Sequence, residues 1–187
     1  MDADDEELLT GSTRDPEAFE ALVVRLSGVL HGYLVRRAPD AADDLLAEVW
    51  LRAFTGRAGF DAGRGTARAW LFGVARNVLA EHWRRIAQER PDGHRRTPDT
   101  SDPWQAVDQR LDAAALAPRL RDTLAGLPAV ERDLLLLIAW EQLTPTEAAD
   151  VVGVPAGTAR SRLHRARGRL RDALGTTNPL HLSGELA

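Results

Sequence analysis

The sequence predicts an all-α protein built from two small helical domains that are joined by a flexible linker. Hydrophobic residues, chiefly Leu and Ala, make up 44% of the chain, and aromatic residues make up 5%. This composition, with only short β-branched runs, favours helices over sheets. Apolar residues also recur at helical spacing on both sides of a polar stretch near the middle of the chain. The periodic parts predict the domains, and the polar stretch predicts the linker.

The first domain is expected at residues 15–87, after an acidic segment at residues 1–14. Pro16 begins an amphipathic helical stretch, which ends at Pro39. A second helix is expected at about residues 41–54, with one apolar face made of Ala42, Leu45, Leu46, Val49 and Ala53.

A loop that contains four glycines follows at residues 55–65. A third helix is expected after it, at about residues 66–86. The spacing of its apolar residues predicts a buried stripe of Leu71, Val74, Ala75, Val78 and His82.

The linker is expected at residues 88–112. Residues 87–102 are polar, contain two prolines and show no helical periodicity. Asp102 followed by Pro103 is a typical helix start, so helix is expected to resume there and to continue to Ala125.

The second domain is expected at residues 113–174 and is followed by a tail at residues 175–187. A strongly apolar helix at residues 129–141 precedes a short helix at 144–152 and a last helix at 156–174. A turn of Gly-Val-Pro joins the last two helices, which is the layout of a helix-turn-helix. Its first helix is expected to begin with a capping box made of Thr144 and Glu147.

The last helix separates an apolar face from a basic one. At 100° per residue, the face expected to pack on the domain consists of Ala159, Leu163, Ala166 and Leu170. The opposite face carries Arg160, Ser161, His164 and Arg165, and the flank carries Arg162 and Arg169.

This basic face predicts binding to double-stranded DNA. Residues 156–171 hold six Arg and no acid, so we expect no carboxylate to neutralise them. A protruding helix of this kind enters the major groove, where arginines bind guanine edges and phosphates. Arg160 and Arg165 are the candidates for guanine, and Arg162, Arg167 and Arg169 are the candidates for phosphate. The alternatives are RNA, an acidic protein, or plain solvation of a surface helix.

The charge of the chain is segregated rather than basic overall. The net charge is −4, and residues 1–20 hold eight acids against one Arg. All 24 basic residues are Arg, which binds phosphate and guanine bidentately where Lys does not. Such segregation focuses the electric field at one surface.

Several function classes are disfavoured. The chain has no Cys, and its five His residues show no HExxH or similar spacing, so we expect no metal site and no cofactor. Neither a phosphate-binding loop nor a nucleophile elbow is present, so an enzyme is not expected. No apolar run approaches the roughly 20 residues of a membrane span, and the acidic N-terminus lacks the layout of a signal peptide. A soluble cytoplasmic protein is expected.

Three segments resemble a known family, the bacterial sigma factors of RNA polymerase. LPAVERDLLLLIAWEQLTPTEAADVVGVPAGTARSRLHRARGRLR, at residues 127–171, is similar to domain four, which reads the −35 promoter element. Its stretch GTARSRLHRAR is similar to the extracytoplasmic-function (ECF) group of the sigma-70 family. AADDLLAEVWLRAF at 41–54 and ARAWLFGVARNVLAEHWRR at 67–85 resemble domain two of the same group, in the expected order.

The resemblance implies that the first domain binds the β′ clamp of core RNA polymerase. The matching segment is Asp43 to Phe54, and its candidate contact residues are Asp43, Asp44, Glu48, Trp50, Leu51 and Phe54. We expect the two aromatic residues and Leu51 to project away from the core stripe. A plain amphipathic helix with an acidic outer face is the alternative.

The resemblance also implies that the first domain opens the −10 element. The loop at residues 60–66 and the helix after it are the matching segment, with candidate residues Arg64, Gly65, Arg76, Asn77 and Arg84. A Gly-rich loop beside an arginine-bearing helix can hold an extruded base. Trp70 and Trp83 are candidates for stacking on that base, although a role in the core is favoured for each.

The resulting hypothesis is an ECF sigma factor. Its partners would be core RNA polymerase, through the β′ clamp and the β flap, and promoter DNA. An anti-sigma factor that covers the same helices is a further partner that the resemblance suggests. The alternative is a helix-turn-helix regulator that acts without core polymerase.

Overall fold

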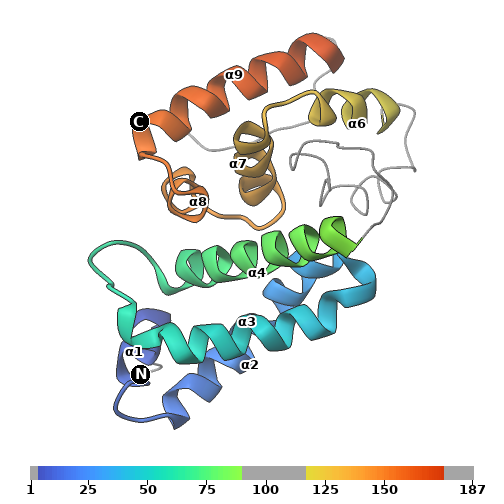
Figure 1. The fold of residues 1–187 in the computed structure, drawn as a ribbon. Coiled ribbons are helices and arrows are strands. Elements are labelled where there is room, and N and C mark those ends of the chain that lie inside the picture. Colours follow the sequence, from blue (N-terminus) through green and yellow to red (C-terminus); the bar gives the residue numbers. More distant parts are fainter. Residues whose placement is uncertain (1–3, 90–116, 175–187) are drawn as a thin grey trace. The chain divides into compact units, whose positions relative to one another are not determined.

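The computed structural model describes residues 4–89 and 117–174, and every regular element in these ranges is helical (Figure 1). The prediction of an all-α fold is therefore confirmed. The chain divides into two compact units, Met1–Gln109 and Arg110–Ala187. The predicted linker and tail, and the helix start at Asp102, lie outside the described residues.

The described part of the N-terminal unit contains four α-helices and two short 3-10 turns. These are α1 (Asp5–Gly11), α2 (Glu17–Val35), η1 (Pro39–Ala41), α3 (Ala42–Gly56), η2 (Arg57–Gly59) and α4 (Ala67–Glu89). The last three α-helices pack on one another, and α1 packs against α2 and α4. The predicted apolar face of α3 is confirmed by the burial of Ala42, Leu45, Val49 and Ala53, whereas Leu46 is half-buried.

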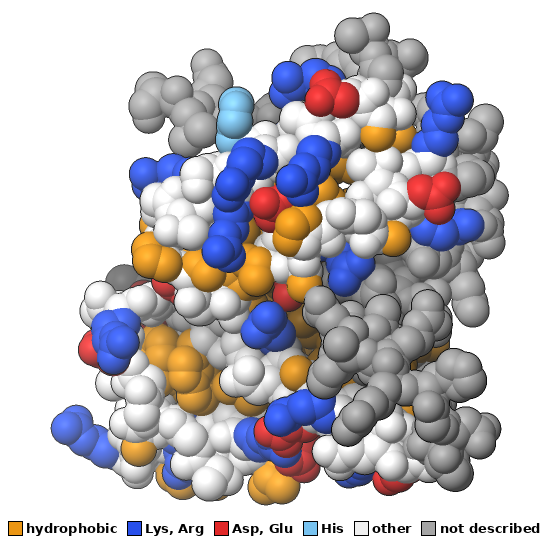
Figure 2. All heavy atoms as spheres, turned by 45° about the horizontal axis from the view of Figure 1, so that its top comes forward, with side chains coloured by type: hydrophobic (Ala, Val, Ile, Leu, Met, Phe, Trp, Pro, Cys, Tyr) orange, Lys and Arg blue, Asp and Glu red, His pale blue; other side chains and the backbone are white. Residues whose placement is uncertain are grey.

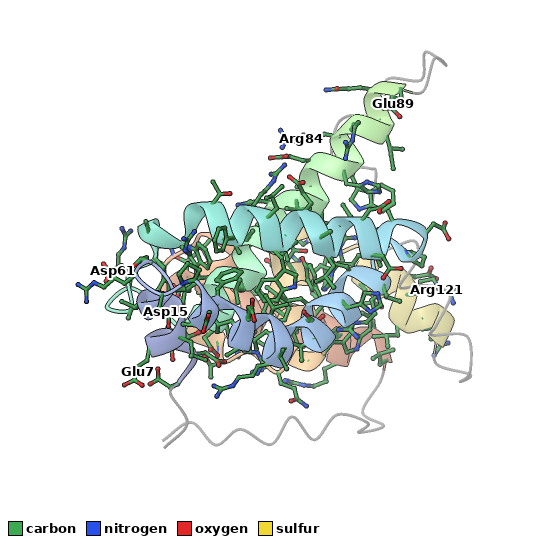
Figure 3. The ribbon with its side chains drawn as sticks, turned by 90° about the horizontal axis from the view of Figure 1, so that it is seen from below. Glu7, Asp15, Asp61, Arg84, Glu89 and Arg121 are labelled. Carbon is green, nitrogen blue, oxygen red and sulfur yellow. The ribbon has the colours of Figure 1, made fainter. Side chains whose placement is uncertain are left out.

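The buried stripe of α4 is only partly the predicted one. Leu71, Ala75 and Val78 are buried as expected, but Val74 and His82 are half-buried. Phe72 and Leu79 fill the core instead, and the ring of Phe72 packs edge-on against Tyr33 of α2. The last turns of α4, which carry Arg84 and Glu89, angle away from α3 (Figure 3), and His82 lines a groove of about 730 Å³ between the two helices.

Helix α1 is a feature that the acidic composition of residues 1–14 did not predict. Asp4 caps its start, with the Glu7 backbone N–H donating to Asp4 Oδ1 at 2.7 Å. Leu9 and Ser12 are fully buried, so the segment is part of the domain. Leu8 and Leu9 are adjacent and stand among many carboxylates, so they give no helical periodicity, which explains why the helix was missed.

Helix α2 is long and apolar enough, by length and composition alone, to cross a membrane. Glu20 and Arg25 interrupt its apolar residues, so the helix is not an uninterrupted apolar run of the length that a membrane span needs. A core helix passes the same test, and α2 buries six side chains against the rest of the unit. They are Phe19, Leu22, Leu26, Leu30, Tyr33 and Leu34.

The C-terminal unit has four described helices. These are α6 (Ala117–Ala125), α7 (Ala129–Ala139), α8 (Pro145–Val152) and α9 (Ala156–Leu174). Helix α9 packs against each of the other three. Helix α7 ends two residues before the predicted boundary, because Gln142 takes a left-handed conformation with φ of 56° and the Leu143 N–H turns back to the Leu137 carbonyl.

Candidate nucleic-acid interface

Helices α8 and α9 form the predicted helix-turn-helix. The Glu147 backbone N–H donates to Thr144 Oγ1 at 3.2 Å, and the Thr144 N–H donates to Glu147 Oε2 at 2.8 Å, so the capping box is confirmed. Gly153 ends α8 with φ of 73°, a left-handed conformation that favours glycine. Ala148 and Ala149 are fully buried, and their small side chains let the helices of the unit approach closely.

Helix α9 has the two faces that its sequence predicted. The inward residues Ala159, Leu163, Ala166 and Leu170 are all buried. The outward residues Arg160, Ser161, His164 and Arg165 are all exposed. Figure 2 shows arginine side chains spread over this side of the C-terminal unit. Packing therefore fixes the helix by one face and leaves the other exposed.

The prediction that no acid neutralises this helix is wrong. Glu131, in the first turn of α7, lies beneath it with a side chain that is 7% exposed. Arg169 Nη1 donates to Glu131 Oε2 at 3.0 Å, and Arg165 Nε lies 3.9 Å from Glu131 Oε1. Sequence reasoning missed this contact because the carboxylate comes from another helix, 38 residues away from Arg169.

The other candidates on α9 differ in exposure. Arg162 and Arg167 are half-buried on the flanks, whereas Arg160 is exposed and makes no ion pair within the described residues. The candidate −35 residues thus fall into an outward group and a flanking group, with Arg169 bound to α7.

Only some of the candidate polymerase-binding residues of α3 are exposed on the surface. Asp43 and Asp44 are exposed, Leu51 is 61% exposed and Phe54 is 37% exposed. Trp50 is half-buried, because its Nε1 donates to Ser27 Oγ of α2 at 3.0 Å. The expectation that Trp50 projects away from the core stripe is therefore wrong, and the exposed apolar part of this face is Leu51 with Phe54.

An aromatic cluster fixes that face against its neighbours. The ring of Phe19 in α2 meets Trp50 edge-on at 5.6 Å and Phe54 at 5.2 Å, measured between ring centroids. The guanidinium of Arg57 lies 3.7 Å from the centroid of the Phe54 ring. Edge-on aromatic pairs and stacked cations hold side chains in one orientation. Asp43 is also held, with its Oδ1 3.0 Å from His31 Nε2.

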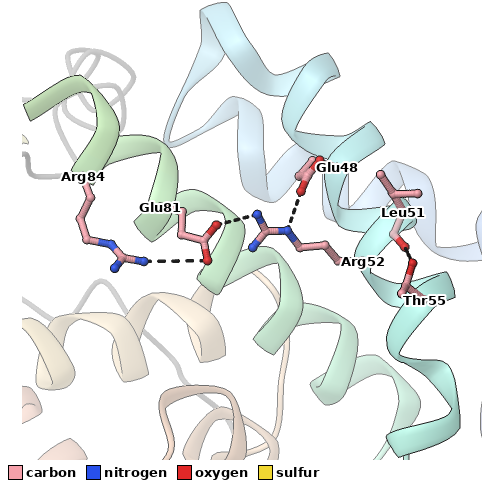
Figure 4. Close-up of polar contacts among 6 residues, drawn as sticks. All are labelled: Glu48, Leu51, Arg52, Thr55, Glu81 and Arg84. Atoms are coloured by element: carbon pink, nitrogen blue, oxygen red, sulfur yellow. Dashed lines mark hydrogen bonds and ion pairs between the residues drawn. The ribbon is translucent and has the colours of Figure 1, made fainter. Parts of the chain in front are cut away.

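Glu48, the remaining candidate on α3, belongs to an ion-pair network that joins α3 to α4 (Figure 4). Arg52 Nε donates to Glu48 Oε1 at 2.6 Å, and Arg52 Nη2 donates to Glu81 Oε2 at 2.5 Å. Arg84 Nη2 lies 3.9 Å from Glu81 Oε1. Hydrogen bonds to Glu81 and Glu48 raise the pKa of Arg52, and the bond from Arg52 lowers the pKa of Glu81. Sequence reasoning identified neither Arg52 nor Glu81.

The candidate −10 residues lie on a loop and on one side of α4. Arg64, Asn77 and Arg84 are exposed, whereas Gly65 and Arg76 are half-buried. A surface groove of about 300 Å³ runs along this side of α4, lined by Arg52, Val74, Asn77, Ala80, Glu81 and Arg84.

The two tryptophans of α4 pack against other rings of the domain. Trp70 meets Phe60 edge-on with 5.8 Å between ring centroids, and Trp83 lies 5.2 Å from the His82 ring. Both indoles are half-buried. Burial lowers the pKa of His82, as does the nearby positive charge of Arg85.

Helix α1 also holds the start of α4. The backbone N–H of Ala67 donates to Glu6 Oε1 at 2.9 Å, and Asp5 Oδ1 lies 3.2 Å from Arg25 Nη1 of α2. A carboxylate at a helix N-terminus satisfies an otherwise unpaired N–H and complements the helix dipole. Asp5 and Glu6 thus make structural contacts within the domain.

Comparison with protein families finds two matching models, one in each unit. Residues 19–89 match the model described as sigma-70 region 2, and residues 118–170 match the model described as sigma-70, region 4. The first match covers α2 to α4, and the second covers most of α6 to α9.

Curated relatives agree with these matches. The chain is 30% identical over 168 residues to the ECF RNA polymerase sigma factor RpoE of Cereibacter sphaeroides, covering 84% of this chain and 87% of the relative. It is 37% identical over 146 residues to the ECF RNA polymerase sigma factor SigC of Mycobacterium tuberculosis, covering 77% of this chain and 74% of the relative.

Two solved structures share the fold. One is CnrH in complex with the cytosolic domain of CnrY, with a TM-score of 0.61, 23% identity, and coverage of 94% of this chain and 100% of that chain. The other is the sigma factor RpoE of Bartonella quintana in complex with the anti-sigma factor NepR, with a TM-score of 0.58, 22% identity, and coverage of 86% and 98%.

Proposed function

The chain belongs to the extracytoplasmic-function group of the sigma-70 family of RNA polymerase sigma factors, and we propose that it binds core RNA polymerase and directs it to specific promoters in the cytoplasm. The N-terminal domain would bind the polymerase and the −10 element, and the C-terminal domain would bind the −35 element. Each domain would bind its promoter element weakly. Because the two domains are on one chain, binding of one places the other at a high effective concentration near its element, so together they select a promoter that neither would select alone.

The observation that carries this proposal is the outward face of α9. Arg160, His164 and Arg165 are exposed on a helix whose opposite face is buried in a helix-turn-helix. In the major groove, Arg160 and Arg165 would bind guanine edges, and Ser161 and His164 would contact the same stretch of bases. Arg162 and Arg167 on the flanks would bind phosphates.

For the −10 element, the proposed site is the loop at residues 60–66 with the exposed side of α4. Arg64 and Gly65 lie on the loop, and Asn77 and Arg84 lie on α4 beside the surface groove. Arg76 is half-buried on the same helix. An extruded base of the melted strand would lie against this surface, with guanidinium groups along its backbone.

For core polymerase, the proposed site is the exposed face of α3, which would bind the β′ clamp. Leu51 and Phe54 form an apolar patch next to the carboxylates of Asp43 and Asp44. An exposed apolar patch with a charged rim is typical of a protein interface. Glu48 would contribute to this interface through the orientation of Arg52. The C-terminal domain would contact the β flap.

An anti-sigma factor is a further proposed partner. The two solved relatives were found with the cytosolic domain of CnrY and with the anti-sigma factor NepR. An inhibitor that covers Leu51 and Phe54 would compete directly with core polymerase.

Run-off transcription with purified core polymerase and a promoter library tests the proposal. We expect the chain to bind core polymerase in a pull-down and to select templates with defined −35 and −10 elements. A helix-turn-helix regulator would bind duplex DNA without core polymerase. A chain that binds DNA but neither binds core polymerase nor supports run-off transcription would contradict the proposal.

A further inference from the structure

Glu131 is a buried carboxylate placed directly beneath the arginine row of α9. It lies in the first turn of α7, where the helix dipole favours a negative charge. A buried carboxylate is costly unless cations or N–H donors surround it. Two guanidinium groups of α9 supply that compensation, so α7 and α9 are joined by charge as well as by apolar packing.

The two arginines approach this carboxylate in different ways. Arg169 donates a hydrogen bond from its terminal nitrogen Nη1, with 3.0 Å between the nitrogen and Oε2. Arg165 approaches with its inner nitrogen Nε, and the 3.9 Å separation is too long for a hydrogen bond. Both side chains remain half-exposed, at 52% for Arg169 and 59% for Arg165. One arginine is bound to the domain, and the other is only attracted to it.

We infer that Glu131 is a positioning residue for −35 recognition, which holds Arg165 in a DNA-reading orientation and keeps Arg169 from binding phosphate. This inference rests on the proposed function of α9. With Nε directed at the carboxylate, the terminal Nη nitrogens of Arg165 are left for a bidentate contact with a guanine edge. Arg169 uses a terminal nitrogen inside the protein, so its role is to clasp α9 to α7.

The charge of Glu131 makes this role distinguishable from a purely structural one. A carboxylate near the DNA face opposes every phosphate, so it weakens binding to any DNA sequence. An oriented Arg165 strengthens binding at one base pair only. Glu131 should therefore lower the affinity for DNA of any sequence, and it should raise the discrimination between the −35 base pair read by Arg165 and other base pairs. A residue that only stabilised the fold would raise both the affinity and the discrimination.

The test compares Glu131→Gln with the wild type in the complete holoenzyme, which is the full chain bound to core polymerase. Two promoter fragments are used, one selected in the run-off experiment and one with the −35 base pair read by Arg165 replaced. We expect Glu131→Gln to bind the replaced fragment more tightly, with a salt slope larger by about one as Arg169 reaches a phosphate. Discrimination between the fragments should fall by about tenfold as Arg165 loses its orientation.

Asp150→Asn is the matched control. It removes the same charge from α8, where Asp150 is exposed and makes no described ion pair with α9. We expect discrimination to stay at the wild-type value in this variant. A fall in discrimination equal to that of Glu131→Gln would show that net charge, and not the contact with Arg165, is responsible, and would overturn the inference.

Two further variants test the inference independently, and the second of them, Arg169→Ala, does not require Glu131→Gln to fold. In an Arg165→Ala background, Glu131→Gln should cause no additional loss of discrimination, because its effect passes through Arg165. Arg169→Ala alone should leave the salt slope at the wild-type value. A slope that falls by about one in Arg169→Ala would place Arg169 on a phosphate and overturn the inference.

Wild-type discrimination between the two fragments measures the proposed function itself, and the change caused by Glu131→Gln measures the role of Glu131. A wild type that discriminates, together with an unchanged ratio in a folded Glu131→Gln protein, would refute the positioning role while leaving −35 recognition intact.

Discussion

Arg52 of the N-terminal domain and the outward arginines of α9 in the C-terminal domain play opposite parts. In the N-terminal domain, Arg52 is bound by Glu48 on its own helix and by Glu81 on α4, so its charge serves to join two helices. In the C-terminal domain, Arg160 and Arg165 lie on the exposed face of a helix that is held by apolar packing, and one buried carboxylate reaches only the inner nitrogen of Arg165. The same residue type therefore stabilises a fold where a carboxylate reaches its terminal nitrogens, and offers a binding surface where none does.

The largest effect is expected from the buried side of α9. Leu163→Ala should lower the free energy of unfolding of the C-terminal domain by about 2–5 kcal/mol, because Leu163 is buried and truncation of its side chain leaves a cavity. His164→Ala, one residue along on the exposed face, should leave stability nearly unchanged. Thermal unfolding measures both. Equal destabilisation by the two substitutions would contradict the assignment of faces.

The next largest effect is expected on DNA binding. Arg165→Ala should cost about 1–3 kcal/mol at a single −35 base pair, because a bidentate contact to guanine is lost. Arg162→Ala should instead weaken binding to all sequences and reduce the salt slope by about one. Holoenzyme binding to a set of single-base-pair −35 variants separates the two. Losses that are equal and independent of sequence would mean that α9 reads bases through other residues.

A smaller effect is expected at the junction of α1 and α4. Glu6→Ala should reduce the stability of the N-terminal domain by about 1 kcal/mol, since the Ala67 N–H loses its capping carboxylate. Glu7→Ala is the matched control, because Glu7 is an exposed acid on the same helix. Denaturant unfolding provides the comparison. If both substitutions had the same effect, the charge of the segment would matter and the contact would not.

The smallest effect is expected from the network at Arg52, whose members are partly exposed. Arg52→Ala should reduce stability slightly at neutral pH. The pKa of Glu81 is lowered in the folded state, so its contribution is present above the ordinary carboxyl pKa and is lost as the pH falls through the lowered value. Thermal melts of wild type and variant should therefore converge on acidification. A difference that grew at low pH would contradict the ionic character of the network.

The sequence predicted what depends on periodicity and local capping. The two faces of α9, the capping box at Thr144 and the apolar face of α3 all follow from spacings of a few residues. The contacts it missed come from elsewhere in the chain: Glu131 beneath α9, Glu81 against Arg52, and Glu6 at the start of α4. Spacing shows which side of a helix is polar, but it does not show which distant carboxylate meets that side.

The burial of two side chains, Trp50 and His82, also differed from the prediction, because tertiary packing determines it. Trp50 shares the outer side of α3 with Leu51, yet its indole turns to Ser27 and Phe19 of α2. His82 lies in register with the core stripe of α4, yet it is half-buried because it lines a groove between α3 and the last turns of α4. The partners of an indole on a neighbouring helix and the groove between two diverging helices are properties of the assembled domain, so neither outcome could be predicted from periodicity.

Site-specific crosslinking tests most directly the claim that α9 presents its outward face to promoter DNA. A photo-crosslinking amino acid at His164, in holoenzyme bound to its promoter, should react with bases of the −35 element. The same group at exposed Asp122 on α6 should not react there. Crosslinks from His164 to polymerase alone, with none to the −35 duplex, would contradict the account.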